Sequence, residues 1–136
     1  MIMREILFRG KRIDNGEWVE GYYYKAKYCR TDDELCDYIT VPHPKEYNEP
    51  SSHYIVNLET VGQYTGLKDR NGINIFEGDI VSISGDFKGI YTCVWEEYHF
   101  DYELENKTMR CCLACVYSDD IKVIGNIHDN IEPLKG

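Results

Sequence analysis

The chain has 136 residues, of which 43% are hydrophobic and 29% charged, so it is large enough for a core and too apolar for wholesale disorder. Fifteen Lys and Arg against 24 Asp and Glu give a formal net charge of −9, which disfavours nucleic acid as a partner because a polyanion needs a basic surface. The absence of a signal-peptide pattern and of a membrane-length apolar run predicts a cytoplasmic protein with no membrane partner, whose 6 cysteines are mostly reduced.

The chain begins with the pattern of an aromatic β-hairpin. Alternating residues 6–11 predict a short strand, residues 14–16 (Asp-Asn-Gly) favour a tight turn, and residues 18–24 return as the partner strand. Gly21 lies in the middle of that return strand, which indicates a bulge or a close neighbour above it.

The next segment is less regular. Residues 28–36 favour an acidic connection over the alternative of one helical turn at 32–37, and residues 38–41 are a strand by composition. Three of the four prolines fall within residues 42–52, which predicts an exposed loop before the strand 53–56.

The organising stretch is residues 59–83, which joins the aromatic front half to an aliphatic back half. It contains β-forming residues, a turn at residues 69–72 (Asp-Arg-Asn-Gly), a corner at 77–79 (Glu-Gly-Asp) and a strand at 80–83. Short strands separated by small turns follow; the expected strands are residues 90–95, 96–104, 109–117 and 121–124.

No amphipathic helix of ten or more residues is expected, so the fold class is mainly β. We expect an N-terminal aromatic β-hairpin lobe over residues 1–75 and a small SH3-like β-barrel lobe over residues 76–136, with one compact domain as the alternative.

The cysteines are the first candidates for chemistry. Cys112 and Cys115 have the spacing of a metal-binding knuckle, and Cys111, Cys29 or Cys36 could complete four ligands. On a regular strand, however, Cys112 and Cys115 would point to opposite faces, so a shared metal requires a turn between them. Buried reduced thiols are the favoured interpretation, with metal, disulfide and redox roles as alternatives.

The acidic corner is the second candidate. Glu77 and Asp79 could form a carboxylate pair for acid–base chemistry or for Mg²⁺, but no nucleophile or phosphate loop accompanies them. The favoured interpretation is a solvated corner in which Asp79 accepts hydrogen bonds from turn amides. The histidines are far apart in the sequence and are interpreted as surface residues; they are His43, His53, His99 and His128.

The third candidate is the aromatic face of the first hairpin, formed by Trp18, Tyr22 and Tyr24. Such rings stack on bases in RNA-binding sheets, but a basic groove would accompany them, and the only local basic cluster is Lys25, Lys27 and Arg30. Core packing or contact with another subunit is therefore favoured.

One pattern resembles a known family. Residues 61–67 (VGQYTGL), with Asp69, residues 71–72, Ile75 and residues 77–81 (EGDIV), are similar to the signature of the YopX family of phages and prophages. Supporting matches lie near both ends of the chain, at residues 4–6, 8–9, 123–127 and 129–130. The middle, from about residue 29 to residue 52, matches no pattern of the family.

The resemblance implies a mostly β protein, encoded by a phage or prophage, that forms homo-oligomers in the cytoplasm of its bacterial host. It implies no activity, catalytic residue, metal or cofactor. We expect a non-enzymatic accessory protein that acts through contacts with itself or with phage or host proteins. The alternative is an acidic decoy that mimics nucleic acid and occupies a host DNA-binding protein, which the net charge of −9 favours.

Overall fold

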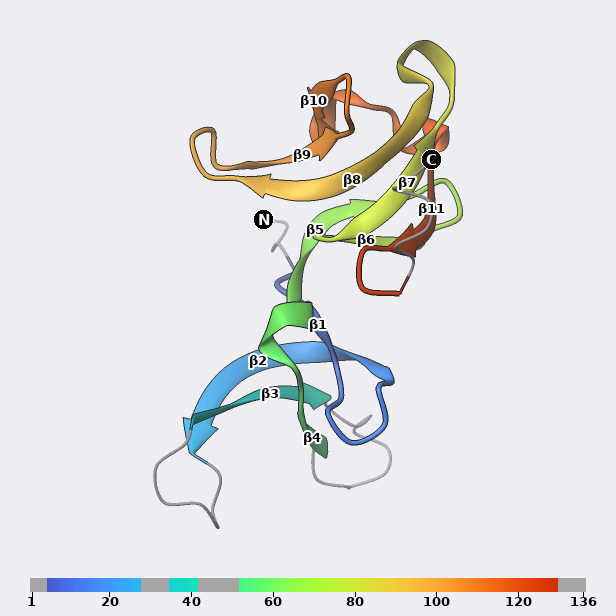
Figure 1. The fold of residues 1–136 in the computed structure, drawn as a ribbon. Coiled ribbons are helices and arrows are strands. Elements are labelled where there is room, and N and C mark those ends of the chain that lie inside the picture. The colour runs from blue at the N-terminus through green and yellow to red at the C-terminus, as the bar shows by residue number, and fades with distance from the viewer. Residues whose placement is uncertain (1–4, 28–34, 42–51, 130–136) are drawn as a thin grey trace. The chain divides into compact units, whose positions relative to one another are not determined.

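The computed structural model describes residues 5–27, 35–41 and 52–129, and within them it confirms the mainly β class (Figure 1). Within these ranges the regular elements are the strands of two antiparallel sheets and four short 3₁₀ turns. The first sheet runs in the order β4 (Ser52–Ile55), β3 (Leu35–Val41), β2 (Trp18–Lys27), β1 (Phe8–Lys11), β5 (Gly62–Lys68) and β6 (Asn74–Phe76). The second runs in the order β10 (Arg110–Cys112), β9 (Asp101–Glu105), β8 (Gly89–Glu96), β7 (Asp79–Ile83) and β11 (Ile121–Asn126). The 3₁₀ turns are η2 (Leu58–Thr60), η3 (Gly85–Phe87), η4 (Leu113–Cys115) and η5 (Ser118–Asp120).

The chain divides into two compact units, residues 1–63 and 64–136, at a point inside β5. Gly62 and Gln63 at the start of β5 pair with β1, whereas Tyr64 and Lys68 pair with β6. The division expected after residue 75 stays a prediction.

The first unit contains the expected hairpin of β1 and β2, in which Lys11 lies opposite Trp18. Its turn is longer than a two-residue loop, since the amide of Arg12 donates to the carbonyl of Glu17 at 2.9 Å. Gly16 has φ +73°, a conformation in which the missing Cβ avoids strain.

Gly21 has the close neighbour that its position predicts. A Cβ at this residue would lie 2.1 Å from the carbonyl oxygen of Thr40 on β3 and 3.2 Å from Cγ2 of Ile39. The first unit therefore needs glycine here so that β2 and β3 can approach each other.

The core of the first unit is small and is closed by polar contacts. Ile39 and Val56 are buried, and the Phe8 and Tyr23 rings are 5.6 Å apart. The Tyr23 hydroxyl donates to Asp37 at 2.5 Å, and this hydrogen bond, together with burial, raises the pKa of Tyr23 to about 12. The proline-rich residues 42–51 and the connection 28–34 lie outside the described residues, while residues 35–37, part of the alternative helical turn, are strand.

The second unit packs its core on one side of the sheet centred on β8. The buried members of this core come from β6, β7, β8, β9, η4 and β11 and the residue after η4; they are Ile75, Val81, Ile83, Tyr91, Cys93, Leu104, Leu113, Val116 and Ile121. The expected turn at residues 69–72 is confirmed, and its Asp69 is 4% exposed. Asp69 accepts hydrogen bonds from the amides of Asn71 and Ile73 within the turn and of Val123 on β11.

The expected SH3-like barrel is not seen, because the five-stranded sheet is open with β10 and β11 at its edges. Strand β10 has three residues and, among the described strands, pairs with β9 alone, while β11 crosses to pair with β7. The sequence pattern of short strands and turns is the same for an open sheet and for a closed one.

Two of the expected back-half strands are wrong. The sequence predicts one strand over residues 96–104. In the structure a turn at residues 97–100 separates the end of β8 from the start of β9. The segment 109–117 was also expected to be one strand, but it stops at Cys112 and continues as η4. In that turn Leu113 and Val116 both reach the core, whereas an extended chain would place them on opposite faces.

Candidate functional site

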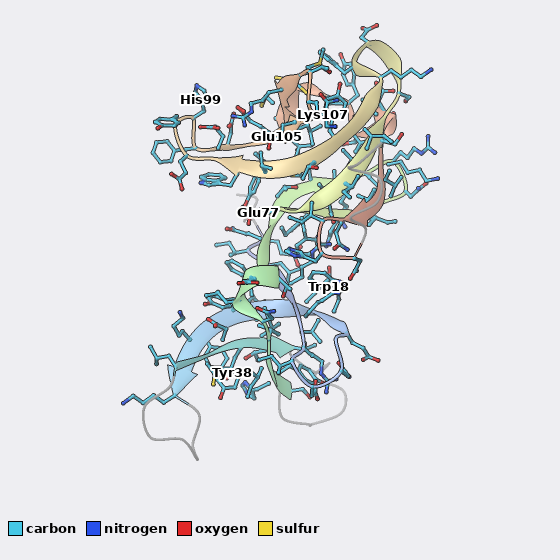
Figure 2. All side chains as sticks on the ribbon, in the orientation of Figure 1. Trp18, Tyr38, Glu77, His99, Glu105 and Lys107 are labelled. Atoms are coloured by element: carbon cyan, nitrogen blue, oxygen red, sulfur yellow. The ribbon has the colours of Figure 1, made fainter. Side chains whose placement is uncertain are left out.

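The most prominent surface feature is the hairpin of β8 and β9 in the second unit (Figure 2). Its turn exposes 89% of Tyr98 and 79% of Phe100, and Trp95 below it is 40% exposed. Trp95 and Tyr102 meet edge to face with ring centroids 5.0 Å apart, which extends the aromatic surface down the hairpin. We call Trp95, Tyr98, Phe100 and Tyr102 the aromatic tip.

The conformation of the tip is set by local constraints. Phe100 has φ +51°, the only positive value at a non-glycine residue in the described chain. The amide of Tyr98 donates to the Glu96 carboxylate at 3.0 Å, which holds the start of the turn. A large aromatic ring in this backbone region is an outlier, and outliers of this kind cluster at functional sites.

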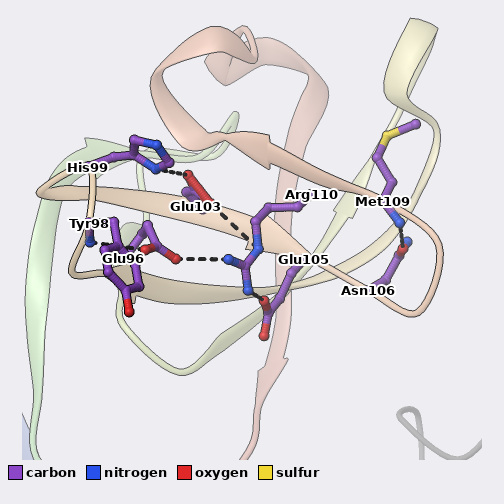
Figure 3. Close-up of polar contacts among 8 residues, drawn as sticks. All are labelled: Glu96, Tyr98, His99, Glu103, Glu105, Asn106, Met109 and Arg110. Carbon is purple, nitrogen blue, oxygen red and sulfur yellow. Dashed lines mark hydrogen bonds and ion pairs between the residues drawn. The ribbon is translucent and has the colours of Figure 1, made fainter.

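A charged cluster lies on the same hairpin and on the neighbouring strand β10 (Figure 3). Arg110 on β10 forms ion pairs with Glu96 at 2.8 Å, with Glu103 at 3.5 Å and with Glu105. The single guanidinium does not balance the carboxylates around it, so the hairpin keeps an excess of negative charge. These carboxylates are Glu96, Glu103 and Glu105, and Asp101 at the start of β9 adds a further negative charge to the hairpin.

Among the residues that the structure describes, His99, Asp101 and Glu103 form a group arranged to hold a metal ion. One nitrogen of His99 and one oxygen of each carboxylate all lie within 4.8 Å of one another. The Glu103 side chain is 10% exposed, and its Oε2 is 3.7 Å from Nδ1 of His99. Sequence reasoning missed this group because the turn at residues 97–100 was not expected, and only that turn brings His99 back over β9.

The cysteines predicted as a knuckle are partly brought together. Cys112 and Cys115 interact through their side chains because η4 supplies the turn that a shared metal requires, and Cys111 is half-buried beside them. Burial raises the pKa of the Cys111 thiol, with smaller contributions from Cys112 and Cys115. Burial likewise raises the pKa of the Cys112 thiol. Cys36 belongs to the first unit, and Cys29 lies outside the described residues.

The acidic corner has a structural explanation. Asp79 is 1% exposed and its Oδ2 accepts from the amide of Phe76 at 2.8 Å, as expected for a turn residue, although the corner is buried rather than solvated. Glu77 is half-buried, and burial raises its pKa. Between them Gly78 adopts φ +91°, and its backbone bonds both Cys93 and Ile127. The hydrogen bonds of Asp79 and Gly78 hold the β6–β7 corner.

The aromatic face of the first hairpin is partly exposed. Tyr22 is 57% exposed, and Tyr24 stacks on Tyr38 with its hydroxyl 3.0 Å from His53. Trp18 instead lies under the cations of Arg9 and Lys11. Of the remaining histidines, His128 is half-buried and His43 lies outside the described residues.

In the described ranges no helix is long and apolar enough to cross a membrane.

The aromatic tip and its charged cluster are the candidate functional site, and comparison with known proteins gives the family of the chain. The model of the YopX protein family matches residues 7–135, nearly the whole chain. The chain belongs to the YopX family. This confirms the resemblance of residues 61–67 and 77–81.

The fold is also found in a solved structure. The crystal structure of protein EF1440 from Enterococcus faecalis matches with a TM-score of 0.53 and 24% sequence identity, covering 97% of this chain and 99% of that one. No curated protein matches the chain in sequence. Family membership and this neighbour fix the fold and leave the activity to be inferred from the surface.

Proposed function

We propose that this YopX-family chain is a phage or prophage accessory protein of the bacterial cytoplasm that acts through protein contacts as a homo-oligomer. The observation that carries the proposal is the aromatic tip, with Tyr98 and Phe100 almost fully exposed on a hairpin. Tyr, Trp and Phe are enriched at interface centres, and each buries about 150–250 Å² when covered.

The occupant proposed for the tip is a second copy of the chain. Exposing large aromatic rings beside one another is unfavourable in water, and a symmetric contact between two tips would bury both sets at once. Arg110 on β10 pairs with Glu96 and Glu105 of the hairpin, so the surface around the rings offers both charge signs to a partner copy.

Light scattering after size-exclusion chromatography tests the proposal over a range of protein concentrations. We expect the wild type to be an oligomer and the double variant Tyr98→Ser, Phe100→Asn to be monomeric, since Asn tolerates the positive φ of residue 100. Tyr117→Ser is the matched control, because Tyr117 is 81% exposed in the same unit but lies outside the hairpin. A wild type that stays monomeric at high concentration contradicts the proposal, and an oligomer indifferent to the tip variant contradicts the assigned surface.

The second candidate function is the acidic decoy, favoured by the net charge of −9. Affinity capture from host lysate separates the two proposals. A decoy retains basic DNA-binding proteins and releases them as salt is raised, because the attraction is electrostatic. A homo-oligomer of the aromatic tip retains tagged copies of itself with little dependence on salt.

A further inference from the structure

We propose that His99, Asp101 and Glu103 bind one divalent transition-metal ion at the β8–β9 hairpin. Their ligand atoms already lie within 4.8 Å of one another, the spacing of groups that share a single ion. The proposal does not depend on self-association, because all three residues belong to one chain.

The local fold produces this arrangement. Asp101 and Glu103 are two residues apart on β9, so their side chains lie on the same face of the sheet. The turn at residues 97–100 then returns the chain so that His99 stands over that face, with Nδ1 at 3.7 Å from the Glu103 carboxylate (Figure 3). The His99 side chain is 71% exposed, which leaves its ring free to turn either nitrogen toward an ion.

Independent support comes from hydrogen bonding that the carboxylates lack. Oδ1 of Asp101 and Oε1 of Glu103 are both buried and accept no hydrogen bond among the described residues. The Glu103 side chain is nine-tenths buried, and its nearest cation, Nε of Arg110, is at 3.5 Å. Buried carboxylate oxygens are costly to leave without a hydrogen-bond donor. A metal ion bound beside Asp101 and Glu103 would offset that cost, in addition to the ion pair that Arg110 already forms with Glu103.

The donor set selects the class of metal. One imidazole with two carboxylates suits Zn²⁺, Co²⁺ and similar ions, whereas Mg²⁺ and Ca²⁺ prefer oxygen ligands alone. Cys112 lies directly opposite Glu103 across the β9–β10 pair, so the thiols are the natural competitors for the ion.

Titration of the full chain with Co²⁺, followed by visible absorption, tests the site. We expect one equivalent to bind with weak d–d bands and without the near-ultraviolet charge-transfer band of a cobalt thiolate. His99→Ala and Asp101→Asn should each weaken binding at least about 10-fold. Both positions are partly exposed, and circular dichroism checks that the variants keep the fold.

Matched controls separate this site from other donors. Glu97→Gln removes a neighbouring exposed acid, His53→Ala removes an exposed histidine of the first unit, and Cys112→Ser with Cys115→Ser removes the thiol pair. All three should bind Co²⁺ as the wild type does, and excess Mg²⁺ should not displace it. Absence of stoichiometric binding, binding unchanged in His99→Ala, or a charge-transfer band lost with the two cysteines would each overturn the proposal.

Discussion

Gly21 shows how one residue decides the spacing of two strands. Its ideal Cβ would lie 2.1 Å from the Thr40 carbonyl oxygen, a distance that only movement of the backbone can relieve. Gly21→Ala should therefore destabilise the protein by about 1–3 kcal/mol, measured by urea unfolding. Glu20→Ala, at the exposed neighbouring position, should stay within about 0.5 kcal/mol of the wild type. Equal stability of Gly21→Ala and the wild type would contradict the close approach.

Asp69 is a second residue with a structural role, because its buried carboxylate accepts hydrogen bonds from three backbone amides. Burial by itself would raise the pKa of Asp69, but hydrogen bonds from the amides of Val123, Ile73 and Asn71 outweigh burial and lower it. Since its pKa in the folded state lies below the unfolded value of about 3.9, the stabilisation is complete above that pH and is lost as the pH falls through the folded pKa.

Asp69→Asn should accordingly destabilise the protein by about 3 kcal/mol at neutral pH, because an amide cannot accept on both sides. The variant should also lose less stability than the wild type on acidification below about pH 4. Urea unfolding across pH measures both effects, with the exposed Asp86→Asn as control. Parallel pH profiles for Asp69→Asn and the wild type would rule out this role.

At the scale of elements, the β8–β9 turn is held by a residue in a disfavoured conformation. Phe100 has φ +51°, which costs an ordinary side chain about 1–2 kcal/mol, more than the entropy that glycine loses on folding. Phe100→Gly should thus be more stable than Phe100→Ala by about 0.5–1 kcal/mol in thermal or urea unfolding. Both variants remove the ring, so their difference isolates the backbone; the opposite order would show that residue 100 is not left-handed in solution.

Elements marked by turn chemistry were predicted well from the sequence. Residues 14–16 and 69–72 contain Asn-Gly, and both are turns in the structure. The turn at residues 97–100 contains no glycine, proline or asparagine, and its alternating aromatic residues imitate a strand. The metal-binding group at His99, Asp101 and Glu103 could not be predicted for the same reason, since it exists only once the chain turns there.

At the scale of the whole molecule, the net charge makes the stability of the fold depend on salt concentration. With a formal charge of −9 at pH 7, the folded chain repels itself, and salt weakens that repulsion. Raising NaCl from low ionic strength to about 0.15 M should raise the midpoint of thermal unfolding at pH 7. Near the isoelectric point, about 4.8, the same salt should have much less effect. A midpoint that falls with salt at pH 7 would mean that ion pairs such as Arg110–Glu96 outweigh the net repulsion.

The sequence by itself determined the mainly β class, the family and the turns that require glycine, because these depend on local backbone preference and on alternation of side chains. Only the tertiary structure decided that the second sheet stays open, that Leu113 and Val116 reach the core through a 3₁₀ turn, and that His99 meets Asp101 and Glu103. These outcomes depend on which strands pair and on which residues the core accepts. Such choices are made between segments far apart in the chain, where local pattern carries no information.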